Sequence, residues 1–337
     1  INQLFDQGRL TPDTLLRDCA GVELPHFAPD ITVHQLLTHT YGIPDYFDEA
    51  VMDDYEELWR QMPMYTIRQP ADFLPLFQDK PMQAPPGSTF VYNNGGYVLL
   101  GLIVEYMTGT PFAKYIADHI FRPAGMTDSG YFANNQLPPR TAHSYIENAD
   151  GTWRSNIYAV PIVGGPDGGA YTTAADMGRF WQALLAHTLL NAETTDRLLW
   201  PYAETGSPSP YDHYGRGMWI EAGADGIRKY FVEGSDPGVA FRSAVYPAHG
   251  LTLTILANTG HTLWPVFREI EALVAPLDGL SAQAGANTPA RDLLPQVVAP
   301  YAGGLPHPLT QQELSDFLAK NSQWSLVEMP DEYAVDG

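Results

Sequence analysis

The segment Tyr92-Asn93-Asn94 combines residue types that could act together on a carbonyl group. It lies between Pro86-Gly87 and a predicted helix that begins near Gly95. A tyrosine at the mouth of a helix can hold its hydroxyl near a reacting group, and nearby cations would lower its pKa from the ordinary value of about 10. The side chain of Asn94 can hydrogen-bond a substrate amide and a lysine at once. Because Tyr-x-Asn is a common tripeptide, asparagines that only cap the helix are the alternative.

A second segment, residues 232–238, reads Val-Glu-Gly-Ser-Asp-Pro-Gly at the end of a predicted strand. Its candidate binding residues are Val232, Glu233, Gly234 and Ser235. Gly234 would let the backbone or acyl group of a substrate approach the strand edge. The N–H group of Ser235 could donate to an oxyanion. An ordinary turn between strands is the alternative interpretation.

Other chemically suggestive residues carry weaker patterns. The glycine-rich stretch at residues 164–169 lacks the spacing of a Rossmann or phosphate-binding loop, so we interpret it as a tight loop entering a helix. The ten histidines include no His-Glu-x-x-His motif, and Cys19 is the one cysteine. The sequence therefore predicts no metal site and no disulfide within the chain.

Composition and charge limit the classes of partner. With 45% hydrophobic and 17% charged residues, the 337-residue chain has the composition of a globular protein. Its net charge of −21 favours solubility and disfavours nucleic acid and anionic membrane surfaces as partners. No apolar run reaches the length of about 18 residues that a membrane-spanning helix needs.

The order of the predicted elements indicates the fold class. Apolar spacing and capping residues predict helices at residues 1–8, 33–40, 48–62, 95–107, 112–121 and 174–186. Runs rich in β-branched and aromatic residues predict antiparallel strands at residues 215–221, 228–234, 239–247 and 251–258, before a helix at residues 263–273. Helices followed by strands favour an α+β fold, in which helices cover an antiparallel sheet.

Several segments stand in a characteristic order. They are LLTHTYGIPDY at residues 36–46, PGSTFVYNNGGYVLLG at residues 86–101, FRPAGM at residues 121–126 and GGAYTTAADM at residues 168–177. Together they resemble the segments of the β-lactamase and penicillin-binding-protein family of serine hydrolases. That family includes class C β-lactamases, D-alanyl-D-alanine carboxypeptidases, D-aminopeptidases and certain carboxylesterases. The opening INQLFDQGRL is similar to the stretch that follows the family's nucleophile helix.

The resemblance implies a fold, a domain division and a reaction. It implies a β-lactamase-like domain over residues 1–277, with an antiparallel sheet flanked by helices and an all-helical region. Residues 278–337 would form a C-terminal extension, with an Ala-, Pro- and Gly-rich linker and a short helix from Thr310 to Lys320. The implied reaction is hydrolysis of an ester, amide or β-lactam through an acyl-enzyme. A small molecule or peptide would be the substrate, and no metal or organic cofactor is implied.

The resemblance also implies roles for the candidate residues. Tyr92 matches the tyrosine that assists proton transfer, and Asn94 matches the asparagine of the same motif. Residues 232–234 fall where the family has Lys-Thr-Gly or His-x-Gly, and the N–H group of Ser235 would be one of two oxyanion donors. Val232 departs from this pattern because it replaces a side chain that could bind a substrate carboxylate. An esterase or amidase with a less anionic substrate is therefore favoured over cleavage of penicillin or D-Ala-D-Ala.

A larger departure concerns the nucleophile. The family's Ser-x-x-Lys motif supplies the attacking serine and an activating lysine. The four lysines here, Lys80, Lys114, Lys229 and Lys320, are preceded three residues earlier by Phe, Pro, Gly and Phe. The chain alone is therefore expected to be inactive, and the family pattern places the motif roughly ten residues before Ile1.

Three explanations stay open. The chain is a fragment that lacks its N-terminal part, its start is mispredicted, or it is a natural pseudoenzyme. We favour the first two, because the family sheet also takes edge strands from the N-terminal region, and their loss would expose an unpaired edge and apolar surface. The alternative function is a non-catalytic protein that binds a ligand or peptide on the same fold.

Overall fold

A computed structural model describes residues 1–48, 52, 54–223, 226–260 and 263–271. The α-helices are α1 (Asn2–Asp6), α2 (Leu16–Cys19), α3 (Val33–Leu37), α4 (Leu58–Gln61), α5 (Asn94–Thr108), α6 (Phe112–Ile116), α7 (Ala174–Leu185) and α8 (Ala192–Leu198), and residues 263–271 are also helical. The 3₁₀ segments are η1 (Tyr55–Glu57), η2 (Met64–Thr66), η3 (Pro70–Leu76) and η5 (Pro247–His249), and η4 (Ala117–Phe121) is a π-helix. The strands are β1 (Tyr145–Glu147), β2 (Trp153–Ser155), β3 (Ala203–Glu204), β4 (His213–Tyr214), β5 (Trp219–Gly223), β6 (Gly226–Asp236), β7 (Val239–Tyr246) and β8 (Leu251–Ala257).

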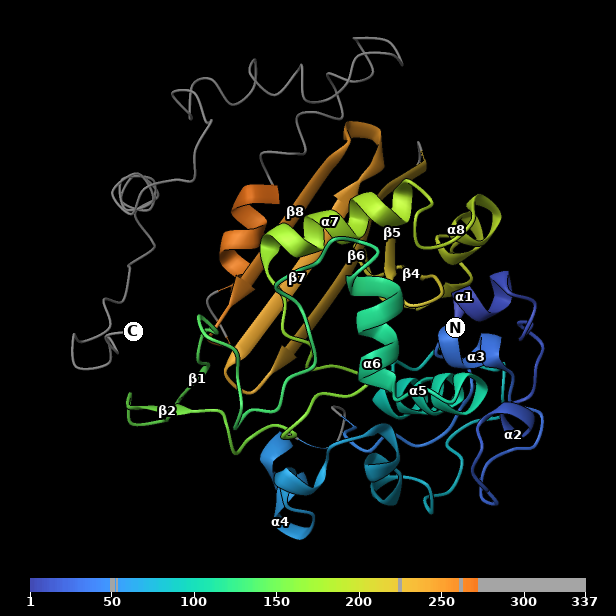
Figure 1. Ribbon diagram of the computed structural model, residues 1–337, viewed down its shortest axis with the longest axis horizontal. Coiled ribbons are helices and arrows are strands. Elements are labelled where there is room, and N and C mark those ends of the chain that lie inside the picture. The colour runs from blue at the N-terminus through green and yellow to red at the C-terminus, as the bar shows by residue number, and fades with distance from the viewer. Residues whose placement is uncertain (49–51, 53, 224–225, 261–262, 272–337) are drawn as a thin grey trace. The chain divides into compact units, whose positions relative to one another are not determined.

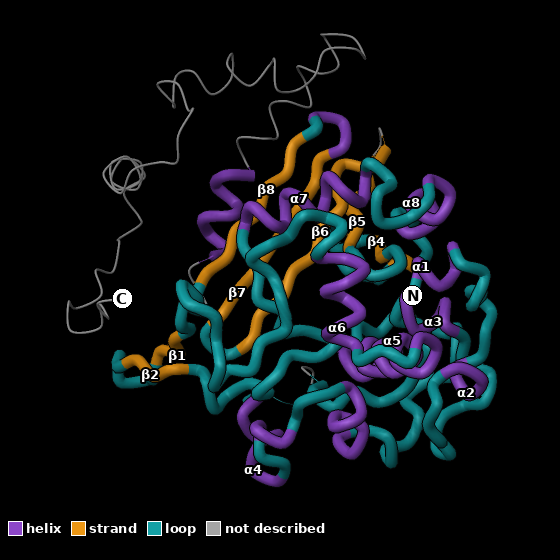
Figure 2. The backbone as a smooth tube through the Cα atoms, viewed as in Figure 1, coloured by secondary structure: helices purple, strands orange, loops and turns teal. Residues whose placement is uncertain are grey.

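Helix α5 forms the centre of the helical region. The side chain of Asn93 caps its first turn by accepting from the N–H group of Gly96, and Gly109 ends it in the left-handed conformation. Apolar residues on most of its circumference are buried, as expected for a helix surrounded by other elements. Figure 1 shows α5 beside α2, α3 and α6, and Figure 2 shows that most of the chain between η4 and α7 is loop.

A six-stranded antiparallel sheet in the order β3-β4-β5-β6-β7-β8 forms the second part of the fold. Helix α7 covers one face, where buried Trp181 donates from Nε1 to the Ser243 hydroxyl at 2.8 Å. On the opposite face, Phe267 of the helix at residues 263–271 packs with Phe231 and Ala244. The α+β fold with an antiparallel sheet between helices is therefore confirmed (Figure 1).

Parts of the sheet backbone have no strand partner among the described residues. Strand β5 pairs with β6 only as far as Phe231, whereas β7 pairs with β6 as far as Asp236. Within the described residues, the β6 backbone beyond Phe231 therefore has no strand partner on its β5 side. Strand β8 pairs with β7 and is the last strand of the described sheet, where Leu256 is 39% exposed.

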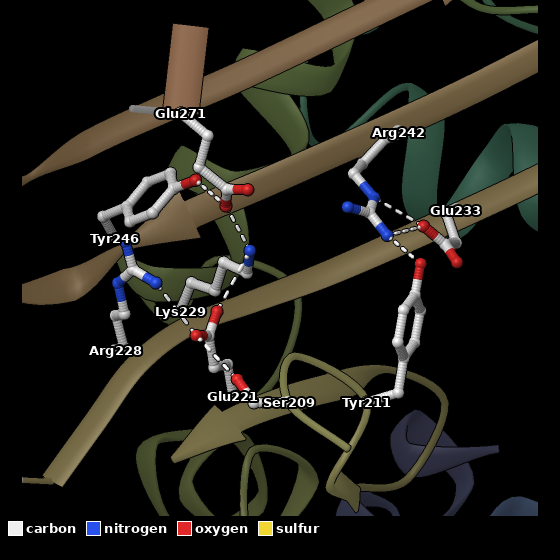
Figure 3. Close-up of polar contacts among 9 residues, drawn as sticks. All are labelled: Ser209, Tyr211, Glu221, Arg228, Lys229, Glu233, Arg242, Tyr246 and Glu271. Carbon is white, nitrogen blue, oxygen red and sulfur yellow. Dashed lines mark hydrogen bonds and ion pairs between the residues drawn. The ribbon is translucent and has the colours of Figure 1, made fainter. Parts of the chain in front are cut away.

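Buried charges fasten the helix at residues 263–271 to the sheet (Figure 3). Lys229, only 1% exposed, forms ion pairs with Glu221 of β5 at 3.0 Å and with Glu271 of the helix. Glu271 also accepts from the Tyr246 hydroxyl at 2.6 Å, and Glu221 accepts from Arg228 at 2.9 Å. The network links β5, β6 and β7 to the helix at residues 263–271. Burial of these charged side chains would cost free energy if they were unpaired.

The structure corrects two predicted elements. The helix expected at residues 48–62 is confined to η1 and α4 among the described residues. The strand expected at residues 215–221 is interrupted, because the N–H group of Gly215 donates to Met218 across a turn and β5 begins at Trp219. The predicted linker and short helix beyond residue 277 lie outside the described residues. None of the described helices is long and apolar enough to cross a membrane.

Candidate active site

A pocket opens between the start of α5, the glycine-rich loop and the sheet. Its wall contains Tyr92, Asn94, Val232 and Glu233, four of the residues singled out from the sequence. The remaining wall residues are His39, Asn93, Tyr97, Pro166, Asp167, Tyr214, Gly217, Met218 and Trp219. Segments about 140 residues apart in sequence therefore meet around one cavity.

Tyr92 stands at the pocket and is 45% exposed. It stacks on Trp219, with ring centroids 5.7 Å apart, and lies 4.4 Å from the ring of His39. Burial lowers the pKa of His39 to about 3, so the imidazole is neutral. Its Nδ1 accepts from the N–H group of Asn93 at 3.2 Å, so Nε2 carries the proton and donates to the Tyr214 hydroxyl at 3.3 Å. His39 thus acts as a neutral support for the Tyr92 segment.

Asn94 is the first residue of α5, and Asp45 fixes its position. The Asp45 carboxylate accepts from the N–H group of Asn94 at 2.9 Å and from its side-chain Nδ2 at 3.3 Å. It also accepts from the N–H group of Gly95 at 3.3 Å, so it caps the helix as well. Since Nδ2 is engaged by Asp45, the Oδ1 atom of Asn94 is the part of the amide that can accept from a ligand.

Residues 232–235 lie on the part of β6 that extends past β5. Val232 and Glu233 line the pocket, whereas Gly234 and Ser235 are the next residues along the strand and pair with Phe241 and Ala240 of β7. The alternative interpretation of residues 232–238, a turn between strands, applies only to Pro237-Gly238, because Asp236 is still paired with Val239. The edge of β6 beyond Phe231, which has no strand partner on its β5 side within the described residues, lies beside the pocket.

The carboxylate of Glu233 is neutralised by a buried arginine (Figure 3). Arg242, 5% exposed, forms hydrogen bonds and an ion pair with Glu233 and donates to the Tyr211 hydroxyl. Its guanidinium also lies 4.8 Å from the ring centroids of Phe231 and Phe267. Arg242, directly opposite Glu233 on the neighbouring strand β7, therefore holds Glu233 in place.

Sequence reasoning did not identify Asp45, Asp167 or Arg242. Asp45 and Asp167 lie within or beside segments quoted for the resemblance, but their roles depend on contacts with residues far away in sequence. Among the described residues, no group of three or more His, Cys, Asp or Glu side chains could hold a metal ion.

Comparisons with known proteins agree with this geometry. A family model described as "Beta-lactamase" matches residues 1–275. A putative penicillin-binding protein of Bacillus subtilis is 28% identical over 258 residues, which cover 76% of this chain and 57% of that protein. The chain thus spans little more than half the length of this curated relative.

Solved structures give the same picture. A penicillin-binding protein from Bacillus halodurans has a TM-score of 0.77 and 47% identity, and the match covers 81% of each chain. A D-amino acid amidase from Ochrobactrum anthropi has a TM-score of 0.63 at 22% identity, over 77% of this chain and 73% of that chain. The second likeness shows the fold alone.

Proposed function

Because this chain belongs to the β-lactamase family, we propose that it supplies most of the active site of a serine hydrolase that cleaves an ester, amide or β-lactam through an acyl-enzyme. The observation that carries the proposal is the shared pocket. Tyr92, Asn94 and the free edge of β6 at Val232 line one cavity, as an acyl-transfer site would need.

In the proposed reaction, a serine hydroxyl attacks the acyl carbon and the resulting oxyanion accepts from backbone N–H groups of β6, including that of Ser235. Tyr92 passes the serine proton to the leaving group as the acyl bond breaks. Water then attacks the acyl-enzyme, which releases the acid and restores the serine. Asn94, held by Asp45, offers its amide oxygen to an N–H donor of the substrate.

The nucleophile must come from outside the 337 residues. Within them no serine or threonine stands three residues before a lysine. The proposal therefore assigns the reaction to a protein in which a Ser-x-x-Lys segment accompanies this chain, and it assigns no hydrolysis to the 337 residues alone.

The substrate class follows from the pocket wall. Its residues include no lysine or arginine within the described part of the chain, and Val232 stands where a cationic side chain would bind a carboxylate. We therefore favour a less anionic ester or amide over a carboxylate-bearing β-lactam.

A second candidate is a non-catalytic protein that binds a ligand in the same pocket, and the lack of a Ser-x-x-Lys motif in the 337 residues favours it. The rate of labelling by a fluorophosphonate separates the two, because only an activated serine is acylated. On a protein that carries the Ser-x-x-Lys segment, Tyr92→Phe should slow labelling by about 100-fold to 10,000-fold, since it removes the proton-transfer group.

The matched control is Tyr106→Phe, which removes the hydroxyl of an exposed tyrosine on α5 outside the pocket. It should label at the unaltered rate. Equal rates for both variants would remove Tyr92 from the mechanism, and no labelling of any form would favour the binding protein.

A further inference from the structure

Arg216 is a buried cation that does not line the candidate active site. It lies in the turn between β4 and β5 and is only 6% exposed. Its Nε atom donates to Nδ1 of His34 at 3.3 Å, and its backbone N–H group donates to Leu198 at 3.1 Å. Buried Arg242 is paired with Glu233, but Arg216 forms no ion pair with any residue that the structure describes.

The two terminal nitrogens of Arg216 carry its unused donors. Neither Nη1 nor Nη2 meets an acceptor among the described residues, since the guanidinium donates there through Nε alone. Neither nitrogen is a fully enclosed atom without a partner, so both reach the protein surface. Together they present two parallel N–H groups, which is the geometry that binds both oxygens of a carboxylate.

Residues from three separate segments hold the guanidinium in place. Its central carbon, Cζ, lies 4.7 Å from the ring centroid of Tyr202, which precedes β3, and 5.5 Å from that of Phe5 on α1. His34 on α3 accepts from Nε and packs edge-to-face on Tyr202, with ring centroids 4.7 Å apart. A ligand would therefore meet donors that are already oriented, which lowers the entropic cost of binding.

The charges around Arg216 favour a ligand with a single negative charge. Burial lowers the pKa of His34, so at pH 7 its imidazole is neutral and adds no charge. Burial also lowers the pKa of Arg216, and the charge of Asp13 opposes this shift although the two side chains form no ion pair. A guanidinium stays charged at neutral pH and can neutralise one carboxylate. The second charge of a phosphate would be repelled by Asp13 and by the net charge of −21.

From these observations we propose that Arg216 forms a binding site for a monocarboxylate, separate from the candidate active site. The two carboxylate oxygens accept from Nη1 and Nη2, which pairs a guanidinium that is otherwise buried without a counter-ion. Gly217 and Met218, the next two residues of the same turn, line the pocket. A bound carboxylate would therefore also stabilise the turn that forms one wall of the pocket. This inference goes beyond the proposed hydrolysis and does not depend on it.

Benzoate and benzamide test the site, because they have nearly the same shape and only benzoate is charged at about pH 7.5. NMR spectra of the ¹⁵N-labelled 337-residue chain follow the Nε–H resonances of its arginines during each titration. We expect benzoate to shift the resonance of Arg216 and to bind at least about tenfold more tightly than benzamide. Asp13→Asn removes a nearby negative charge, so it should tighten benzoate binding by about threefold.

Arg216→Lys keeps the charge but loses the two parallel donors, so benzoate should bind at least about fivefold more weakly. The resonance that this variant lacks is that of Arg216. The matched control is Arg197→Lys, which alters a neighbouring arginine that is 58% exposed and paired with Glu193. Benzoate should bind to it as it does to the unaltered chain.

Three results would overturn the proposal. The first is equal binding of benzoate and benzamide to the unaltered chain, which counts even if Arg216→Lys does not fold. The second is benzoate binding of unchanged strength in folded Arg216→Lys. The third is inorganic phosphate that binds more tightly than benzoate, which contradicts the choice of a monocarboxylate. A failure of fluorophosphonate labelling would instead contradict the proposed hydrolysis and leave these titrations valid.

Discussion

Asp45 and Asp167 are two buried carboxyls with different hydrogen-bonding surroundings. Burial raises the pKa of Asp45 to about 6, although the N–H groups of Asn94, Tyr46, Phe47 and Gly95 that donate to it oppose the shift. Burial raises the pKa of Asp167 to about 7, and among the described residues the Tyr46 hydroxyl donates to this carboxyl. Asp45 therefore suits a fixed cap for α5, whereas Asp167 changes charge near neutral pH.

Sequence reasoning identified the residues whose type and spacing form a motif. Four of them line the pocket, namely Tyr92, Asn94, Val232 and Glu233. Sequence reasoning did not identify Asp45 and Arg242, because no local pattern reveals their partners. The contact between Asp45 and Asn94 spans 49 residues of sequence. Such roles follow from the tertiary fold, which a single sequence shows only indirectly.

Among the elements, β6 links the site to the core of the sheet. Beyond Phe231, β6 no longer pairs with β5 and forms the edge of the pocket. Before Phe231, β6 carries Lys229, which belongs to the charged network with the helix at residues 263–271. Burial alone would raise the pKa of Glu221, but the nearby Lys229 and Arg228 charges and hydrogen bonds outweigh it and lower that pKa. The network therefore stabilises the sheet only while both its cations and its carboxylates are present.

Lys229→Met should destabilise the protein by about 3–5 kcal/mol, because it leaves two buried carboxylates without their shared cation. The measurement is the free energy of unfolding from urea denaturation. Lys114→Met is the control, since Lys114 is exposed and its pair with Asp118 lies on the surface of the helical region. That variant should cost less than about 1 kcal/mol. Similar losses in the two variants would mean that the buried network contributes little.

The elements themselves were largely predictable where one period extends over many residues. Helix α5 and strands β7 and β8 have clear apolar patterns and good end signals, and the structure places them within two residues of the prediction. The prediction of one strand at residues 215–221 was wrong, because Gly217, with a φ of 111°, turns the chain between β4 and β5. A turn inside a β-rich run has no periodic signal of its own.

At the scale of the whole molecule, the described residues form a helical region and a helix-covered sheet (Figure 1). Residues from both parts line the pocket. The family segments identified the fold because they occur in order along the chain, from residues 36–46 to residues 168–177. The packing of the loop at residues 164–169 against α5 could not be read from those segments, because it is a tertiary contact.

The central claim is that this chain completes the active site of a serine hydrolase whose nucleophile lies in a Ser-x-x-Lys segment outside the 337 residues. The most direct measurement is fluorophosphonate labelling of the protein purified from its natural source, followed by intact mass under denaturing conditions and mapping of the labelled peptide. We predict that the label lies on a serine three residues before a lysine, and that a chain of 37.2 kDa with this sequence alone takes no label. A label on any serine within the 337 residues, or an unlabelled protein that carries a Ser-x-x-Lys segment, would contradict the claim.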